Sequence, residues 1–222
     1  MKNIILGILT EKQDVTPLLL GGLQDLEPRL GDAELGIATV VDGRIMSRKT
    51  SGNVPDLENV LPTPSAPSQF GIAYQYSSQI HENLKEQAQL YATDDIAVVY
   101  SGFLDNFFPL QGELEALGYE CETQTDAEVI LRFLMYYLNP KLGISLSKAM
   151  KLTLHRLEGH CSIMTLVAQP EPVLLAAHRA CSLAIGASKE SLYLGFNTQA
   201  VKKRACPVIQ IEEEYPLILR SV

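Results

Sequence analysis

The sequence predicts a layered α+β domain in which antiparallel sheets carry helices on their outer faces. Strand patterns crowd the beginning and the end of the chain, and two long helix patterns lie between them. Hairpin signals outnumber strand–helix–strand units, which favours antiparallel over parallel pairing. The chain has 222 residues, of which 46% are hydrophobic and 20% charged, so it can bury a sizeable core. We therefore expect one domain over residues 1–222.

The first third of the chain alternates apolar strand patterns with turn signals. A helix is predicted to begin after Asp14, with a proline in its first turn, and to end before Pro28. Asp42-Gly43 predicts a tight hairpin turn. Three prolines predict an exposed loop at 61–69, and the polar residues 77–89 predict a loop or an irregular helix. The expected strands are 2–9, 35–41, 44–48 and 71–76, with a short helix at 56–60.

The central stretch, residues 96–131, places turns and polar groups at the ends of elements. An apolar run predicts a buried strand at 96–100, which Ser101-Gly102 closes. Pro109 is expected to begin a helix that Gly118 ends. The apolar residues of that helix recur at helical spacing and form its buried face: Leu110, Leu114 and Leu117.

A second helix is predicted after a short polar strand. Thr125-Asp126 cap this helix, which runs from 127 to 138. Binding groups often sit where elements end, so Asp126 is a candidate binding residue. The last third is expected to hold a helix at 145–157, strands at 160–169, 172–179, 183–185 and 192–196, and a hairpin-like tail at 208–219.

The charge of the chain limits the kinds of partner that it can bind. The net charge is −8, whereas nucleic acids and anionic membranes require a basic face, so neither is expected to be a partner. The only basic cluster is Lys202-Lys203-Arg204, which we interpret as a solvated loop. No apolar run approaches the roughly 20 residues that span a bilayer. The N-terminal apolar run is short, is broken by Gly7 and lacks a cleavage site, which indicates a first strand instead of a signal peptide.

The cysteines and histidines show no metal-ligand spacing. The four cysteines are widely separated, with no CxxC motif, and the four histidines are scattered. Cys161 and Cys181 lie in apolar strand patterns, which indicates reduced core residues of a cytoplasmic protein. No cofactor and no metal site are expected.

Several motifs occur in a characteristic order along the chain. They are Gly71-Ile72-Ala73, Tyr100-Ser101-Gly102, Phe103-Leu104-Asp105-Asn106, Gly118-Tyr119 and Gln124-Thr125-Asp126-Ala127-Glu128. This frame resembles the glutaminase domain of class II glutamine amidotransferases, most closely that of glucosamine-6-phosphate synthase, the glucosamine-fructose-6-phosphate aminotransferase. The resemblance covers nearly the whole chain. It implies the fold of the N-terminal-nucleophile (Ntn) hydrolases, a four-layer α-β-β-α sandwich of antiparallel sheets.

The resemblance also implies a catalytic position near the N-terminus. Enzymes of this family cut the side-chain amide of glutamine with an N-terminal cysteine, whose own α-amino group is the base. The matching stretch here begins at Asn3, behind Met1-Lys2. Asparagine has no ionisable nucleophilic atom, and no cysteine occurs in the first hundred residues. We therefore expect that glutamine hydrolysis has been lost.

The oxyanion turn of the family falls on Ser101 and Gly102. In the family an asparagine side chain and the following glycine N–H hold the negative charge that develops during the reaction, and here Ser101 replaces the asparagine. Losing one such donor costs roughly 2.7–4 kcal/mol of transition-state stabilisation. Gly102 also has a purely structural interpretation, since a turn at the end of a strand needs a glycine.

The substrate-binding positions are changed as well. Tyr76 stands where the family has the arginine that clamps the glutamine α-carboxylate, and tyrosine makes no charged two-pronged contact. Asp126 matches the residue that binds the α-ammonium group, although a helix cap alone would also account for it. We expect a more aromatic and less cationic pocket, and hence a ligand less anionic than glutamine, such as a small amine or an amino-acid-like molecule. The expected lining is Tyr74, Tyr76, Ser77, Tyr100, Ser101, Gly102 and Asp126.

These differences predict a pseudoenzyme: a degenerate amidotransferase-like domain that acts as a binding, regulatory or scaffolding module. It would act on its own, with a protein partner or as a homo-oligomer. The alternative is an active amidohydrolase or amidotransferase subunit with an altered amide substrate or a non-cysteine nucleophile. Ser101 and Ser77 are the candidates for that nucleophile, and no histidine is placed by the sequence to activate either one.

Overall fold

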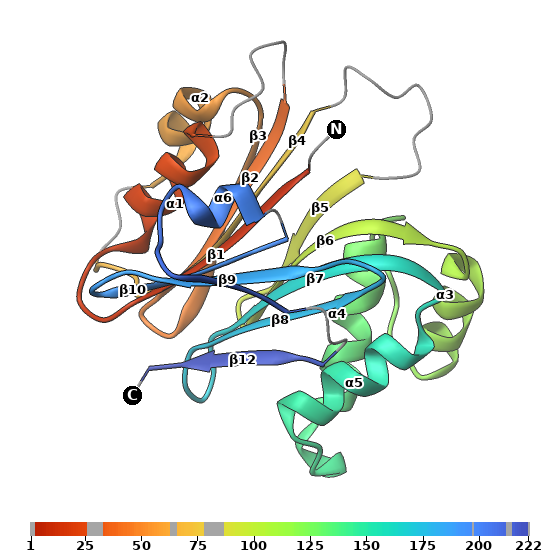
Figure 1. The fold of residues 1–222 in the computed structure, drawn as a ribbon. Helices are drawn as coiled ribbons and strands as arrows, with labels where there is room; N and C mark the ends of the chain where they lie inside the picture. The colour runs from red at the N-terminus through yellow and green to blue at the C-terminus, as the bar shows by residue number, and fades with distance from the viewer. Residues whose placement is uncertain are drawn as a thin grey trace.

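The fold is a sandwich of two antiparallel sheets with helices on both outer faces (Figure 1). The computed structural model describes residues 3–25, 33–62, 66–77, 87–196, 198–211 and 215–221. The four layers run helix, sheet, sheet, helix, which confirms the predicted α+β class and the α-β-β-α sandwich. None of the helices in this part of the chain is both long and apolar enough to cross a membrane.

The first sheet has seven strands in the order β11-β9-β10-β1-β4-β2-β3. The strands described in this sheet pair antiparallel, as the hairpin-rich sequence pattern predicts. The strands are β1 (Ile4–Thr10), β2 (Ala33–Val41), β3 (Arg44–Gly52), β4 (Phe70–Ser77), β9 (Leu183–Ala187), β10 (Ser191–Gly195) and β11 (Val208–Ile211).

The second sheet has five strands in the order β12-β8-β7-β6-β5, again antiparallel. Its central strand, β7, pairs with β6 along the whole length of both strands. The strands are β5 (Gln87–Ala92), β6 (Ile96–Leu104), β7 (Gly159–Val167), β8 (Val173–Arg179) and β12 (Leu217–Arg220).

Helices cover the outer face of each sheet. On the first sheet lie α1 (Val15–Gln24), α2 (Val54–Val60) and α6 (Thr198–Lys202). On the second sheet lie α4 (Asp126–Tyr137) and α5 (Leu146–Arg156), with α3 (Phe107–Ala116) packed beside α4. A 3-10 turn, η1 (Pro140–Leu142), joins α4 to α5.

Three helix starts that the sequence signals are confirmed by their caps. The side chain of Asp14 accepts a hydrogen bond from the N–H of Thr16, and those of Thr125 and Ser145 accept from the N–H three residues later. Each cap satisfies one of the amide groups that a helix start leaves without a partner. The position of Asp126 on the first turn of α4 follows directly from the cap at Thr125.

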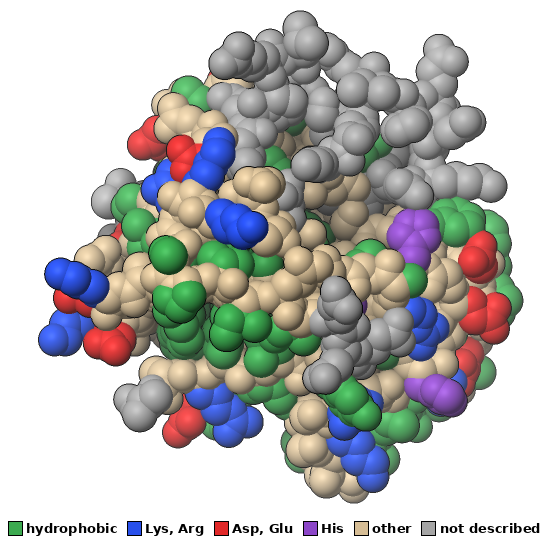
Figure 2. Space-filling model, viewed as in Figure 1, with side chains coloured by type: hydrophobic (Ala, Val, Ile, Leu, Met, Phe, Trp, Pro, Cys, Tyr) green, Lys and Arg blue, Asp and Glu red, His purple; other side chains and the backbone are tan. Residues whose placement is uncertain are grey.

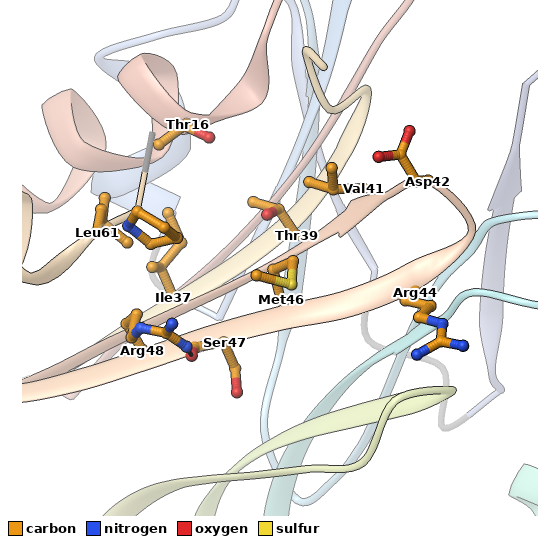
Figure 3. A pocket seen from close by; sticks show the side chains of 11 residues that line it. Thr16, Ile37, Thr39, Val41, Asp42, Arg44, Met46, Ser47, Arg48 and Leu61 are labelled. Carbon is orange, nitrogen blue, oxygen red and sulfur yellow. Dashed lines mark hydrogen bonds between the residues drawn. The ribbon is translucent and has the colours of Figure 1, made fainter. Parts of the chain in front are cut away.

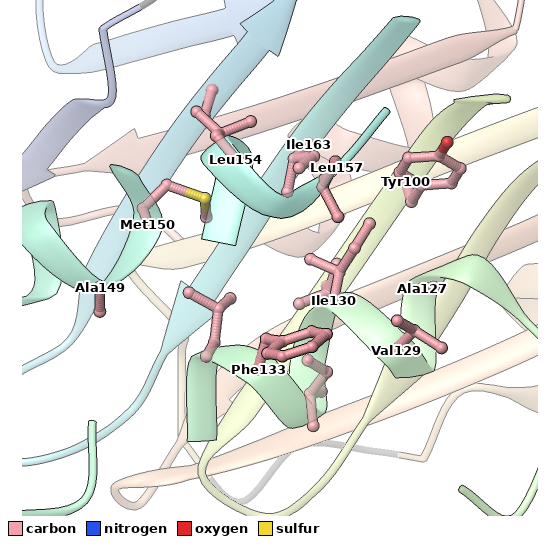
Figure 4. Close-up of a cluster of buried hydrophobic side chains, with 14 of the residues drawn as sticks. Tyr100, Ala127, Val129, Ile130, Phe133, Ala149, Met150, Leu154, Leu157 and Ile163 are labelled. Carbon is pink, nitrogen blue, oxygen red and sulfur yellow. The ribbon is translucent and has the colours of Figure 1, made fainter. Parts of the chain in front are cut away.

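Three buried clusters hold the layers together. One lies between the sheets and includes Ile5, Val99 and Met164. A second lies between the first sheet and its helices. The third, between the second sheet and α4 and α5, includes Phe133, with Tyr100 at its edge (Figure 4). Burying the apolar faces of both sheets is the main favourable contribution to this fold.

One side of the sandwich is closed by partly buried apolar residues. On the face seen in Figure 2, hydrophobic side chains gather where β9, β10 and β12 lie in Figure 1. Residues of these strands pack against the cluster between the sheets: Ile185, Leu192, Leu217 and Leu219.

The prediction that Ser101-Gly102 closes a strand is wrong, because β6 continues to Leu104. Ser101 pairs with Ala88 on β5 and with Ser162 on β7, so the strand has a neighbour on each side at this point. A sequence-local turn signal cannot reveal such pairing. The neighbouring residues Gln87–Gln89 are strand β5 and not loop or irregular helix, whereas residues 78–86 lie outside the described part.

Other local predictions also fail where packing overrides them. The short polar strand before α4 is absent from the described residues 119–124, and Leu117 is 37% exposed instead of facing the core. Ser68, in the predicted exposed loop, is buried and accepts from the N–H of Val40. The tail is not a hairpin, since β11 belongs to the first sheet and β12 to the second.

The basic cluster and the cysteines are also partly different from expectation. Lys202 ends helix α6, and Arg204 forms an ion pair with Asp25, so the cluster is not a free loop. None of the four cysteines, all of which lie in the described part of the chain, forms a disulfide. Cys161 is buried as predicted, but Cys181 is only half-buried.

Candidate functional site

The predicted site residues come together at one end of the sandwich. Asn3 precedes β1, Tyr76 and Ser77 end β4, and Ser101 lies near the end of β6. Because β1 and β4 are antiparallel, the start of one lies beside the end of the other, at the end marked N in Figure 1. The side chain of Ser77 lies outside the described part.

Asn3 and Ser101 are joined across the two sheets. The Asn3 side-chain amide donates to the Ser101 hydroxyl oxygen over 2.8 Å, although the residues are 98 positions apart. Ile5 and Val99 face the core between the sheets, and alternate side chains of a strand share a face, so Asn3 and Ser101 also face the space between the sheets. The positions assigned to the nucleophile and to the oxyanion donor are therefore in direct contact.

Gly102 is required by close packing. Its φ of +155° lies in the region that favours glycine, and a Cβ there would stand 2.2 Å from the carbonyl oxygen of His160. The structural interpretation of this glycine thus holds, but the cause is the approach of β7 and not a turn.

Tyr100 and Asp126 form a second group on the other face of β6. Tyr100 is fully buried in the cluster under α4. Burial raises the pKa of Asp126 to about 6, and the nearby Tyr100 hydroxyl opposes that rise. The two groups influence each other without an ordinary hydrogen bond, since Tyr100 Oη has no partner of good geometry in the described part of the chain. Burial and the Asp126 carboxylate raise the pKa of Tyr100.

The turn before α4 is organised by Glu128, which the sequence reading did not single out. Its side chain is fully buried and accepts from the N–H groups of Glu122 and Thr123, the Thr123 hydroxyl and Arg132. Burial alone would raise the pKa of Glu128, but these hydrogen bonds, the Thr123 hydroxyl first, lower it. Two features of the sequence could have indicated this role: Thr125 and Glu128 in a Thr-x-x-Glu helix start, and Arg132 one helical turn after Glu128.

The start of α4 is also tied to the second sheet. The N–H of Ala127 donates to the side-chain carbonyl of Gln89, over 3.2 Å. Gln89 lies directly opposite Tyr100 in the pairing of β5 with β6. The hydrogen bonds that Glu128 accepts from residues before Asp126, and that of Ala127 after it, together hold Asp126 beside Tyr100.

Tyr74 and Tyr76 of β4, which were expected to line a pocket, are buried. Tyr74 is fully buried, Tyr76 is 8% exposed, and both belong to the cluster between the sheets. Tyr74 donates to the carboxylate of Glu34, which lies opposite Tyr76 on β2. The register of β1 with β4 continues to place Asn3 next to Tyr76. Glu34 is therefore a second carboxylate at this end, and the sequence reading missed it because it becomes a neighbour only through the sheet.

Two cavities lie away from these residues. One of about 310 Å³ lies on the outer face of β2 and β3 (Figure 3), and one of about 160 Å³ is lined by residues of α5 and β8. Neither is lined by Asn3, Ser101 or Asp126. Within the described ranges, no group of three His, Cys, Asp or Glu residues could hold a metal ion.

Comparison with protein families gives one matching model. A model described as a glutamine amidotransferase domain matches residues 77–203, more than half of the chain. The matched range contains Ser101, Gly102 and Asp126 but not Asn3.

Several curated relatives share one name. The chain is 32% identical over 197 residues to the glutamine–fructose-6-phosphate aminotransferase (isomerizing) of Bartonella quintana, covering 89% of this chain and 32% of the relative. It is 33% identical over 181 residues to the protein of that name from Corynebacterium diphtheriae, covering 80% of this chain and 29% of the relative. The chain thus spans about a third of the length of these relatives.

Solved structures show the same fold at low identity. The glutamine phosphoribosylpyrophosphate amidotransferase of B. subtilis, complexed with ADP and GMP, superposes with a TM-score of 0.72 and 19% identity, over 98% of this chain and 49% of that one. A glutamine aminotransferase class-II domain protein from Silicibacter pomeroyi gives a TM-score of 0.57 and 14% identity, over 98% of both chains.

Proposed function

Because the chain belongs to the glutamine amidotransferase domain family, we propose that it is a degenerate member that binds a small amine or amino-acid-like ligand without hydrolysing glutamine. In this role it is a binding module that regulates or scaffolds a protein partner or a second copy of itself.

The contact between Asn3 and Ser101 carries this proposal. The Asn3 amide is no nucleophile, and its hydrogen occupies a lone pair of the Ser101 hydroxyl. Among the described residues, the hydrogen-bond partner of Ser101 Oγ is the Asn3 amide, and no histidine or carboxylate there stands in the place of the base that nucleophilic catalysis requires. The side chains at the positions that the family uses for the nucleophile and for the oxyanion donor are thus hydrogen-bonded to each other.

The charges at this end of the sandwich support a cationic ligand group. Glu34 lies there beside Tyr74, Asp126 lies beside Tyr100 on the other face of β6, and Tyr76 stands where a family member would offer an arginine. An ammonium group gains from a nearby partly buried carboxylate, whereas a ligand carboxylate would meet no matching cation at Tyr76. The proposed ligand is therefore an amine with a small polar body.

Ammonia release tests the loss of hydrolysis. Purified wild-type protein is expected to release no ammonia from glutamine above the buffer rate, because Asn3 stands at the nucleophile position and has no nucleophilic atom. A form that starts at residue 3 and carries Asn3→Cys with Ser101→Asn serves as the matched comparison, since it restores the family's groups. Turnover of glutamine or another amide by the wild type would reject the proposal in favour of an active amidohydrolase with a different nucleophile.

Calorimetry with two matched ligands tests the binding. Glutamine and 4-aminobutanamide, which is glutamine without its α-carboxyl group, differ only in that group. We expect 4-aminobutanamide to bind at least several-fold tighter, and Asp126→Asn to abolish its binding while Asp95→Asn, at an exposed position, has no effect. Glutamine binding as tight as or tighter than that of the amine contradicts the proposed ligand class.

A further inference from the structure

A cavity on the outer face of the first sheet is separate from the candidate site. It measures about 310 Å³ and opens between the β2–β3 hairpin, the start of α1 and the residues after α2 (Figure 3). That volume is at the low end of the range of roughly 300–1,000 Å³ for small-molecule pockets. The cavity belongs to the half of β2 near the Asp42 turn, whereas Glu34 and the candidate site lie at the other end of that strand.

The cavity has an apolar floor built by strand register. Ile37 lies opposite Arg48, Thr39 opposite Met46, and Val41 opposite Arg44. Side chains of directly paired residues point to the same face of the sheet. The three pairs therefore lie side by side on the outer face of the sheet, which α1 and α2 cover only in part. Met46, which belongs to the middle pair, remains 39% exposed, and Leu61 and Pro62 form one wall of the cavity.

Two arginines stand at the rim of this floor. Arg48 donates to the carbonyl oxygen of Ser47 and has no carboxylate partner among the described residues, so most of its five N–H donors are available. Arg44 shares an exposed ion pair with Asp94 at 3.5 Å, which is a weak interaction. Among the described residues of the lining, Asp42 is the one acidic residue, and two guanidinium groups outweigh its charge.

We propose that this cavity binds a small amphiphilic anion, with an apolar body on Thr39 and Met46 and an acidic group held by Arg48 at one rim, while Arg44 at the opposite rim adds positive charge. Burial of the apolar body supplies the affinity, and the forked guanidinium donors match a carboxylate, sulfonate or phosphate group. The site is distinct from the amine site in place and in charge, so the domain has two binding sites for ligands of opposite sign.

Titration with 8-anilinonaphthalene-1-sulfonate tests the proposal, because this probe joins an apolar aromatic body to one anionic group. Binding is followed by fluorescence and mapped by chemical-shift changes of backbone amides. We expect a saturable site whose largest shifts fall on Thr39, Met46 and Leu61. Its uncharged analogue, N-phenyl-1-naphthylamine, is expected to bind at least several-fold more weakly, and sulfate alone not at all.

Variants separate the two parts of the site. Arg44→Gln with Arg48→Gln should weaken probe binding about tenfold, since each exposed charge pair is worth roughly twofold to fivefold in affinity. Met46→Glu should abolish binding, because it places a negative charge where the anion would lie. Arg220→Gln, at an exposed position of β12, is the control and should leave binding unchanged. Circular dichroism shows that each variant is folded. Shifts that map to another surface, or affinity unchanged in the double arginine variant, overturn the proposal.

Discussion

Asp126 lies on the first turn of α4, where burial raises the pKa of its carboxyl to about 6 and the nearby Tyr100 hydroxyl opposes that rise. An acid whose pKa is raised by the fold destabilises the folded protein once it is ionised. A plain helix cap would have the opposite effect, since a carboxylate at a helix start is normally stabilising. The effect of the Asp126 carboxylate on stability therefore has opposite signs for a plain helix cap and for a residue retained to bind a ligand, and it can be measured.

Replacing Asp126 by Asn is expected to stabilise the protein at pH 7.5. In the folded state the carboxyl titrates at about 6 and in the unfolded state near its ordinary value of 3.8. Stability from the protonated form is fully present below pH 3.8 and is lost as the pH rises to about 6. The gain of the Asn variant should grow over that window to about 1–2 kcal/mol, after discounting for partial exposure.

Urea denaturation at several pH values measures this gain, with Asp95→Asn as the neutral control. A destabilised Asp126→Asn variant at pH 7.5 would show that the carboxylate is a structural cap and not a retained binding group.

Among the elements, α4 and the turn before it depend on Glu128. Its buried carboxylate gathers several N–H and O–H donors, and the resulting hydrogen bonds lower its pKa below the ordinary value of 4.5. Because the turn ends at Thr125 and Asp126, Glu128 positions the candidate binding residue without touching a ligand.

Glu128→Gln is expected to destabilise the protein by about 3 kcal/mol at pH 7, since an amide nitrogen would then face donors that have lost their acceptor. A group with a lowered pKa contributes stability above its unfolded pKa and loses it as the pH falls through the folded pKa. The difference from wild type should therefore shrink below pH 4.5. Chemical denaturation at pH 7 and at pH 4 measures it, and the exposed Glu115→Gln variant should change stability by less than about 0.5 kcal/mol.

At the scale of the whole molecule, the packing of the two sheets decides stability. Met164 is fully buried between them, and a Cβ built on Gly7 would stand 2.4 Å from the Met164 sulfur, so the sheets approach closely here. Met164→Ala should cost about 2–5 kcal/mol of unfolding free energy. Phe108→Ala should cost less than about 0.5 kcal/mol, because that ring is 76% exposed on α3. Thermal unfolding of both variants gives the comparison, and equal losses would contradict the assigned core.

Much of the architecture followed from short-range signals along the chain. The caps at Asp14, Thr125 and Ser145 and the turn at Asp42-Gly43 each act over a few residues, and each is present in the structure. The order of motifs also placed the chain in its family and predicted the sandwich. These features are local or are set by spacing, so one sequence is sufficient to predict them.

Packing between distant segments decided the rest. The continuation of β6 through Ser101, the split of β11 and β12 between two sheets, and the contact of Asn3 with Ser101 all join residues far apart in the chain. Burial beneath the second sheet likewise changed Asp126 from an apparent helix cap into a carboxyl with a raised pKa. Residue identities record which groups are present, but the free energy of a charge or a strand edge depends on what the folded chain places beside it.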